Sequence, residues 1–243
     1  MSQYLIGIDV GTSSIKAAVV DASTGQTVAS AHSPAEEMTV SAEQTGWAEQ
    51  HPDLWWEHTI KCVRMALQKT TLDASKVVAI GISYQMHGLV MVDKEHKPLR
   101  PSIIWCDSRA VEIGDKAFKD LGNHYCLQHL LNSPGNFTAS KLKWVKENEP
   151  GIYERIHKIM LPGDYIALKL TGEATTTDTG LSEGIFWDYQ EKSISKKLLE
   201  YYGIDKNLMC TIVPVFAEQG KVKRISRERV GSYARYKNCL SCG

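Results

Sequence analysis

The sequence predicts a mixed α/β domain with a central mixed sheet and helices on both of its faces. Short apolar runs separated by turn residues open the chain and predict strands. Helix-length segments then alternate with further continuous apolar runs, an order typical of α/β folds whose sheet is buried on both faces. Hydrophobic residues make up 43% of the 243 residues, which is enough for a sizeable core.

The first predicted elements are three strands joined by short turns. "YLIGIDV" (4–10) is a short apolar run, "IKAAVVD" (15–21) follows the turn "GTSS", and "GQTVASAHS" (25–33) follows another turn. These connections predict an antiparallel start to the sheet.

The hydrophobic period then changes to that of a helix. Apolar residues fall on one helical face at Trp56, Ile60, Val63 and Leu67, and Asp53 suits the helix start. The remaining predicted elements are strands at 76–84, 88–93 and 102–107 and helices at 110–121, 140–150, 151–161, 163–172 and 192–203.

Charge is unevenly distributed along the chain. Residues 223–243 hold six basic residues and one acidic residue, which leaves the body, 1–222, with five more acidic than basic residues. A body with a net negative charge is not suited to neutralising the phosphates of a nucleic acid, so we expect no nucleic-acid partner. Without a signal-peptide pattern or a run of about 18 apolar residues, a cytoplasmic protein with reduced thiols and no membrane partner is expected.

The first candidate for chemistry is "IGIDVGTSSIK" (6–16). Gly11 lets a ligand approach the backbone, while the turn N–H groups and the hydroxyls of Thr12 and Ser13 are donors for an anion. Asp9 at the strand end has the carboxylate that Mg²⁺ prefers. The alternative is an ordinary hairpin turn, for which these residue types are equally suitable.

Two further stretches place polar groups after predicted strands. "QMHG" (85–88) follows a buried strand, at the strand end where α/β folds bind ligands, although a lone His is more often a structural residue. "IIWCDSRA" (103–110) sets the aromatic face of Trp105 beside the carboxylate of Asp107, a combination suited to a sugar. Its alternative is a core Trp followed by a helix N-cap at Asp107 or Ser108.

These residues together resemble a known family. The strand, "DVGTSSIK" and the next strand are similar to the first phosphate loop of the actin, Hsp70 and sugar-kinase superfamily. Residues 4 to about 222 resemble the N-terminal half of an FGGY-family carbohydrate kinase, and "QMHG" resembles the xylulokinase form of that segment. The later segments "SPGNFTASKLKWV", "LPGDYIALKLTGE" and "TTTDTGLSEGIFWD" also match the family.

The resemblance implies a fold, a reaction and site residues. The fold is an actin-like ATPase (ribonuclease H-like) domain, and the reaction is phosphorylation of D-xylulose to D-xylulose 5-phosphate with ATP and Mg²⁺. The implied phosphate-binding residues are Gly11, Thr12, Ser13 and Lys16, with Asp9 for Mg²⁺. The implied sugar-binding residues are Met86, His87, Trp105 and Asp107. Asp164 and Asp178, with the segments that contain them, are interpreted as helix capping and packing, and substrate contact is the alternative.

The resemblance also sets expectations for the end of the chain. The catalytic Asp of the family, in a G-D-N or G-D-Q motif, is expected just beyond Gly243, with the C-terminal kinase domain absent. Without that domain, the apolar surface on which it would pack is exposed, and this predicts association or a homodimer. Residues 1–222 form the predicted domain, and the tail 223–243 is interpreted as the product of a shifted reading frame. Its Cys239 and Cys242 supply only two of the four ligands that structural zinc takes.

Other functions remain open at this point. The chain is alternatively a catalytically inactive lobe that binds sugar or nucleotide, or part of a kinase for ribulose, gluconate or glycerol.

The frameshift hypothesis is tested by the gene sequence from codon 220 onward. Synonymous codons for "GSYARYKNCLSCG" exist whose +1 frame reads "EVMPGTKTAYLAG", similar to the family stretch before the G-D motif. We expect the actual codons to encode that peptide and a kinase C-terminal half downstream. Codons that encode neither would contradict the hypothesis.

Overall fold

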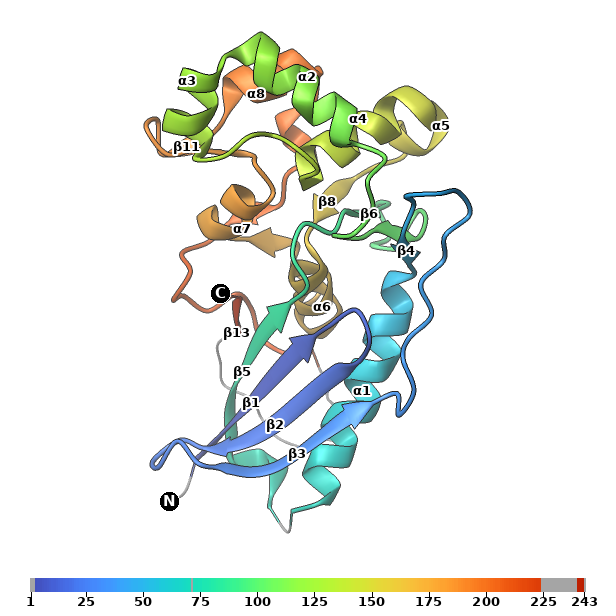
Figure 1. Cartoon of the computed structure of the whole chain (residues 1–243). Coiled ribbons are helices and arrows are strands. Elements are labelled where there is room, and N and C mark those ends of the chain that lie inside the picture. The colour runs from blue at the N-terminus through green and yellow to red at the C-terminus, as the bar shows by residue number, and fades with distance from the viewer. Residues whose placement is uncertain (1–2, 71, 224–239, 243) are drawn as a thin grey trace.

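The computed structural model describes residues 3–70, 72–223 and, for the backbone, 240–242. Its centre is a five-stranded mixed sheet in the order β13-β5-β1-β2-β3 (Figure 1). The strands are β1 (Tyr4–Val10), β2 (Ile15–Asp21), β3 (Thr27–Ser33), β5 (Val77–Tyr84) and β13 (Leu240–Cys242). β2 is antiparallel to both β1 and β3, whereas β5 is parallel to β1 and β13. The predicted mixed sheet with an antiparallel start is confirmed.

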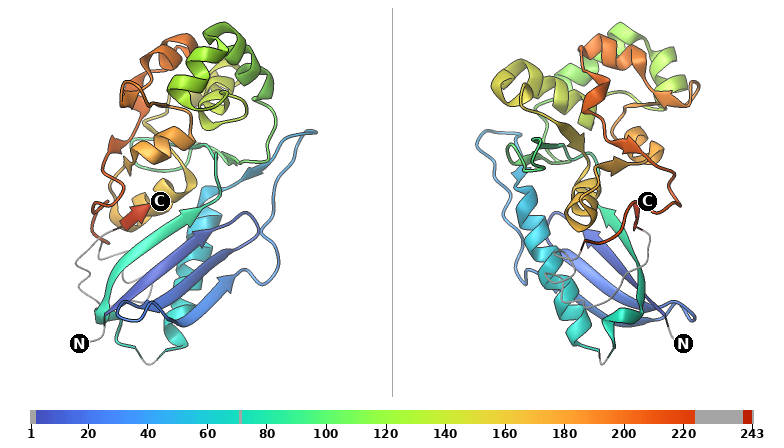
Figure 2. Two further views of the ribbon diagram at one scale, coloured as in Figure 1. Left: turned by 60° about the vertical axis from the view of Figure 1, so that its left-hand side comes forward. Right: turned by 180° about the vertical axis from the view of Figure 1, so that it is seen from behind.

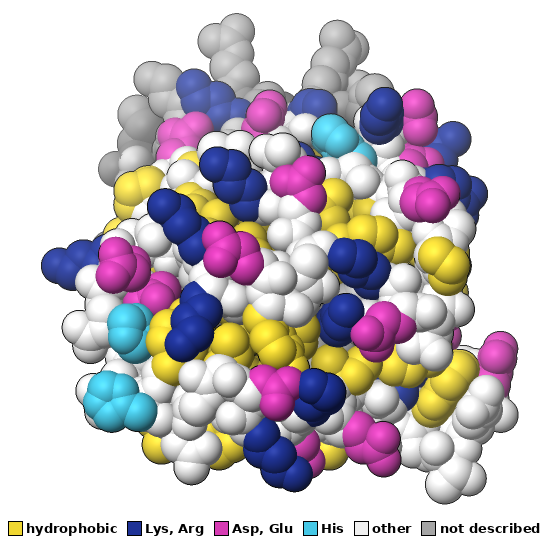
Figure 3. All heavy atoms as spheres, turned by 90° about the horizontal axis from the view of Figure 1, so that it is seen from above, with side chains coloured by type: hydrophobic (Ala, Val, Ile, Leu, Met, Phe, Trp, Pro, Cys, Tyr) yellow, Lys and Arg dark blue, Asp and Glu magenta, His cyan; other side chains and the backbone are white. Residues whose placement is uncertain are grey.

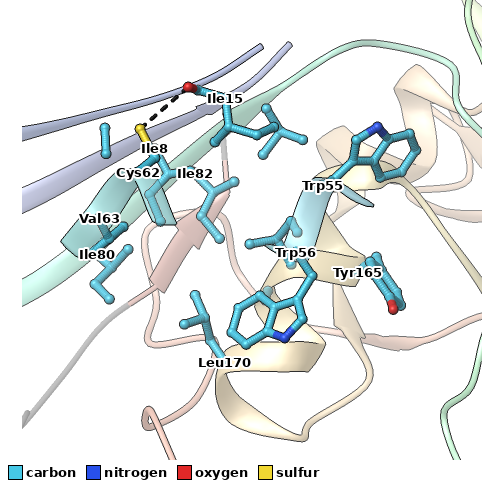
Figure 4. Close-up of a cluster of buried hydrophobic side chains, with 14 of the residues drawn as sticks. Ile8, Ile15, Trp55, Trp56, Cys62, Val63, Ile80, Ile82, Tyr165 and Leu170 are labelled. Atoms are coloured by element: carbon cyan, nitrogen blue, oxygen red, sulfur yellow. Dashed lines mark hydrogen bonds between the residues drawn. The ribbon is translucent and has the colours of Figure 1, made fainter. Parts of the chain in front are cut away.

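One face of the sheet is buried by helix α1 (Pro52–Gln68). Alternate residues of β1, among them Ile6 and Ile8, face this helix, and Trp55 is fully buried in the same core (Figure 4). The Cys62 thiol of α1 contacts two strands of the sheet, with Sγ 3.0 Å from the Ala31 carbonyl oxygen and 3.4 Å from that of Ile15. Burial raises the pKa of this thiol to about 11, so it is a structural residue rather than a reactive one.

The opposite face carries no helix among the described residues. α1 and α6 (Pro162–Thr171) both lie on the α1 side of the sheet in the two views of Figure 2. In this part of the chain the outward positions of the strands include small and polar residues. Among them, Gly7, Ala18, Ser30, Gly81 and Ser83 line an open hollow of about 800 Å³.

The rest of the chain forms a mainly helical part with its own core. Its helices are α2 (Val111–Leu121), α3 (Asn123–Tyr125), the π-helix η2 (Cys126–Leu130), α4 (Thr138–Asn148), α5 (Pro150–Tyr153), α7 (Asp178–Glu183) and α8 (Lys196–Tyr202). Two short 3₁₀ helices are η1 (Ala74–Lys76) and η3 (Lys206–Leu208). The short paired strands are β4 (Glu49–Gln50) with β7 (Ser102–Ile103), β6 (Val90–Val92) with β8 (Lys158–Met160), β9 (Thr175–Thr176) with β12 (Thr211–Ile212), and β10 (Trp187–Asp188) with β11 (Ser193–Ile194).

The predicted helix at 151–161 is wrong in its second half. α5 ends at Tyr153, and residues 158–160 form β8, which pairs antiparallel with β6. An apolar run this short is compatible with a helix or a strand, and pairing with β6 makes it a strand. The strand predicted at 102–107 is also shorter, because β7 ends at Ile103.

Asp164 and Asp178 are both at helix starts, as predicted. Asp164 is buried and accepts a hydrogen bond from the Leu161 N–H at 3.2 Å and from the Thr176 hydroxyl at 2.9 Å. Burial raises the pKa of its carboxyl to about 7. Asp178 is in the first turn of α7, where its negative charge is favourable to the helix dipole.

The surface over the helical part mixes charges of both signs, with Lys and Arg interspersed among Asp and Glu (Figure 3). Such a mixture is typical of a solvated protein surface. None of the helices in the described ranges is long and apolar enough to cross a membrane.

We predict that Gly163→Ala destabilises the fold. A Cβ at Gly163 would lie less than 3.0 Å from ring carbons of Tyr84, so α6 would be pushed away from the end of β5. Overpacking of this kind costs about 1–3 kcal/mol, measurable by urea unfolding. Gly151→Ala is the matched control because a Cβ there meets nothing within 4 Å. Equal stability of the two variants would contradict the prediction.

Candidate functional site

Segments distant in the sequence meet at the carboxyl ends of β1 and β5. The two strands are parallel neighbours with Val10 opposite Tyr84, so the segments that follow them start at the same edge of the sheet. The Gln85 N–H continues this pairing by donating to the Val10 carbonyl at 2.8 Å. α/β folds bind ligands at this edge of a sheet.

The β1–β2 turn exposes backbone donors. Gly11 N–H donates to the Ser14 carbonyl at 3.2 Å, and a Cβ at Gly11 would lie 2.9 Å from that oxygen, so the turn requires glycine. Within the described chain, the N–H groups of Thr12 and Ser13 donate to no protein acceptor. Unpaired successive N–H groups in a tight turn are suited to an anion such as a phosphate.

Asp9 and Lys16 flank this turn on paired strands. Lys16 Nζ lies 3.5 Å from Asp9 Oδ2, and the Ser83 hydroxyl lies 3.4 Å from Asp9 Oδ1. Both charged side chains are about half exposed or more, at 46% for Asp9 and 66% for Lys16. One accessible carboxylate beside a phosphate-binding turn is a common protein contribution to a Mg²⁺ site, so these residues fit the ion. No group of three or more metal-ligating side chains occurs within the ranges described above.

The Thr12 hydroxyl is engaged inside the protein. Oγ1 accepts from Trp105 Nε1 at 2.9 Å and donates to Gln85 Oε1 at 3.1 Å. The predicted Thr12 contact to phosphate is therefore left to its N–H in this conformation. The same bond fixes the indole of Trp105, which is 49% exposed. The structure thus connects the predicted phosphate loop directly to a predicted sugar-binding residue.

The sequence reasoning missed Gln50, a buried residue that completes this network. Its Nε2 donates to the Thr12 carbonyl at 2.8 Å, and its Oε1 accepts from Trp55 Nε1 at 3.0 Å and from Gln85 Nε2 at 3.2 Å. A polar pair, "EQ", directly before a predicted helix was the only available signal, and it fits a surface loop equally well.

Met86 and His87 follow Gln85 at this edge. Met86 is 54% exposed, whereas His87 is half-buried and has a left-handed backbone with φ of 58°. Glu183, at the end of α7, accepts from the His87 N–H, and its Oε1 also lies 3.1 Å from His87 Nδ1. The sequence reasoning did not identify Glu183, because nothing in its local pattern connects it to residue 87.

Lys141 holds two site segments together from α4. Its fully buried ammonium donates to the carbonyls of His87 at 2.9 Å and Ile104 at 3.0 Å. Burial lowers the pKa of Lys141 from 10.5 to about 8, and Asp107 and Glu183 oppose that shift.

Asp107 differs from its predicted role. Its carboxylate is fully buried, accepts from the Ala48 N–H at 2.6 Å, and forms a bidentate pair with Arg109, which also lies 2.7 Å from Glu49 Oε1. The Arg109 guanidinium stacks 3.8 Å from the Trp47 ring centroid. These bonds occupy both carboxylate oxygens, so this geometry favours a structural role over sugar contact.

The alternative interpretation, a helix N-cap at Asp107 or Ser108, is wrong. α2 begins at Val111 after Ala110, and no side chain caps it. Asp107 instead fixes the loop that leads from Trp105 to α2. Of the two cysteines in the tail, Cys239 lies outside the described residues and Cys242 ends β13.

The predicted site residues thus fall into two groups. The structure brings together the phosphate-loop residues, Met86, His87 and Trp105 at one edge of the sheet, and it buries Asp107 beneath them.

Comparison with known proteins identifies relatives of the chain. Residues 4–235 match the profile of the FGGY family of carbohydrate kinases, N-terminal domain, and this range extends beyond the boundary predicted at residue 222. Xylulose kinase of Staphylococcus xylosus is 34% identical over 229 residues, covering 94% of this chain and 46% of the relative. Xylulose kinase of Escherichia coli (strain K12) is 34% identical over 205 residues, covering 84% and 41%. The chain spans about half the length of the curated relatives it matches.

Solved structures agree with this assignment. A xyloylose kinase from Brucella ovis superposes with a TM-score of 0.82 at 32% identity, over 92% of this chain and 46% of that one. Gluconate kinase from Lactobacillus acidophilus reaches a TM-score of 0.87 at 23% identity, over 100% and 48%, a likeness of fold alone.

We predict that Lys141 makes stability rise with pH. Its pKa is about 8 in the folded protein against 10.5 ordinarily, so between these values the unfolded chain binds more protons and the free energy of unfolding increases with pH. Relative to Lys141→Met, the wild type should gain roughly 1–2 kcal/mol from pH 7.5 to 9.5 in urea unfolding.

The comparison with Lys141→Met removes contributions from other titrating groups. Lys143→Met, on the same helix in a pair with Glu147, is the matched control and should change stability by less than about 1 kcal/mol at either pH. A wild-type advantage over Lys141→Met that stays flat or falls with pH would contradict the prediction.

Proposed function

Because the chain belongs to the FGGY family of carbohydrate kinases, we propose that it binds D-xylulose and forms the sugar-binding part of an ATP-dependent kinase that produces D-xylulose 5-phosphate. The single observation that carries this proposal is the hydrogen bond of 2.9 Å between Trp105 Nε1 and Thr12 Oγ1. It joins an exposed aromatic surface suited to a sugar to a turn suited to a phosphate, so the two substrates of a kinase would meet here.

The sugar is proposed to lie against Trp105, with Met86 and His87 beside it. Ring C–H groups pack favourably on an indole face, and His87 Nε2, which has no hydrogen-bond partner among the described residues, is available to a hydroxyl. Fixed positions for these groups hold the reacting hydroxyl near the phosphate, and such positioning accounts for much of phosphoryl-transfer catalysis.

The nucleotide phosphates are proposed to bind at the N–H groups of the β1–β2 turn, with Lys16 adding positive charge. Mg²⁺, held by Asp9 together with phosphate oxygens, would neutralise charge on the phosphates. During transfer, the sugar hydroxyl oxygen bonds to the γ-phosphorus, ADP leaves, and the hydroxyl proton goes to a base. That base is proposed to be the catalytic Asp of the family's G-D motif, since Asp107 is committed to Arg109.

D-xylulose is preferred over other sugars because relatives at 34% identity are xylulose kinases. The second candidate is a lobe that binds sugar without turnover, and it is favoured by the Asp107 carboxylate, which is bonded to Arg109 and to the Ala48 N–H. Release of ADP in the presence of D-xylulose separates the two functions.

We predict that the chain binds D-xylulose by isothermal titration calorimetry, and that Trp105→Ala weakens binding at least about tenfold by removing the stacking surface. Phe216→Ala is the matched control, because Phe216 is 94% exposed and has no place in the site. Tighter binding of D-gluconate or D-ribulose than of D-xylulose would overturn the substrate assignment.

A further inference from the structure

Contacts hold the backbone N–H, the carbonyl, the ring and the Nδ1 atom of His87. Its backbone adopts the left-handed conformation, which is unfavourable for a residue with a Cβ, so the surrounding contacts must maintain it. Glu183 accepts from its N–H, Lys141 donates to its carbonyl, and the Phe137 ring packs edge-on with 4.3 Å between centroids.

The contacts of Nδ1 determine which ring nitrogen carries the proton. Nδ1 lies 3.1 Å from the Glu183 carboxylate Oε1 and 3.2 Å from the Glu183 backbone carbonyl oxygen. An ionised carboxylate and a carbonyl only accept hydrogen bonds, so Nδ1 must be the donor. A neutral imidazole has one N–H, and the other nitrogen is then a bare acceptor.

Nε2 is the remaining ring nitrogen. No group in the described part of the chain forms a hydrogen bond with it, and the His87 side chain is 21% exposed. In the neutral residue this atom therefore offers an acceptor to a bound molecule.

We propose that Glu183 is a positioning residue that fixes His87 in the Nδ1–H tautomer, so that the site requires a hydroxyl donor opposite Nε2. This inference rests on the proposed function for the identity of the ligand. A sugar hydroxyl satisfies Nε2, whereas the carboxylate of a sugar acid at the same place would set two acceptors against each other. Glu183 thereby selects neutral polyols and ketoses over sugar acids bound through their carboxylate.

The tautomer is measured directly by ¹⁵N NMR of histidine-labelled protein above neutral pH, where the two ring nitrogens of each neutral His have distinct shifts. His87→Gln identifies the His87 signals by their loss. We expect a protonated Nδ1 and a bare Nε2 for His87. A protonated Nε2 overturns the inference, even if the protein binds sugar, and a protonated Nδ1 supports the tautomer even if D-xylulose does not bind.

Substitutions of Glu183 test its role. Glu183→Gln keeps an oxygen that accepts from both His87 groups, so it should retain the tautomer and D-xylulose binding within about threefold. Glu183→Ala removes the carboxylate and leaves only the backbone carbonyl of residue 183 as an acceptor for Nδ1. It should therefore raise the fraction of the Nε2–H tautomer and weaken D-xylulose binding about tenfold or more. Ser182→Ala, at the adjacent position, is the control and should match wild type.

The outcomes separate positioning from stability. If Glu183→Ala unfolds, the Glu183→Gln variant and the wild-type spectrum still decide the tautomer. Unchanged tautomer and unchanged D-xylulose affinity in folded Glu183→Ala would overturn the positioning role. Absence of D-xylulose binding in the wild type would count against the proposed function and not against the tautomer.

Discussion

The parallel pairing of β1 with β5 is the constraint on which the candidate site depends. It sets Asp9 opposite Ser83 and ends both strands at one edge of the sheet. Thr12 and Gln85 are 73 positions apart in the sequence, yet they are hydrogen-bonded across this edge. A slip of one residue would turn the apolar face of β5 away from α1 and break these contacts, so burial of that face maintains the site.

A second constraint is the need to satisfy polar groups that the fold removes from water. Lys141, Arg109 and Gln50 are all buried beneath the site, and each bonds to groups from other elements of the chain. An unpaired buried charge costs several kcal/mol and an unpaired buried amide also costs free energy, so these partners hold each side chain in place. The helical part, which contributes Lys141 and Glu183, thereby fixes the geometry of loops that leave the sheet.

This arrangement explains why residue type alone was an incomplete guide to the site. Asp107 has the carboxylate that a sugar site would use, but its oxygens are committed to Arg109 and to the Ala48 N–H. Thr12 has a hydroxyl suited to phosphate, but that hydroxyl positions Trp105. Conversely, Glu183 lies in a segment interpreted as packing and capping, and it sets the state of His87.

The mixed sheet, the amphipathic helix α1, the turn around Gly11 and the family could all be predicted from local periodicity, turn chemistry and short motifs. The folded chain was needed to see that residues 158–160 form a strand, that one face of the sheet carries no helix in the described ranges, and which polar side chains contact one another. Strand pairing and the compensation of buried charge act between residues far apart in the chain, where local pattern carries no information on the partner.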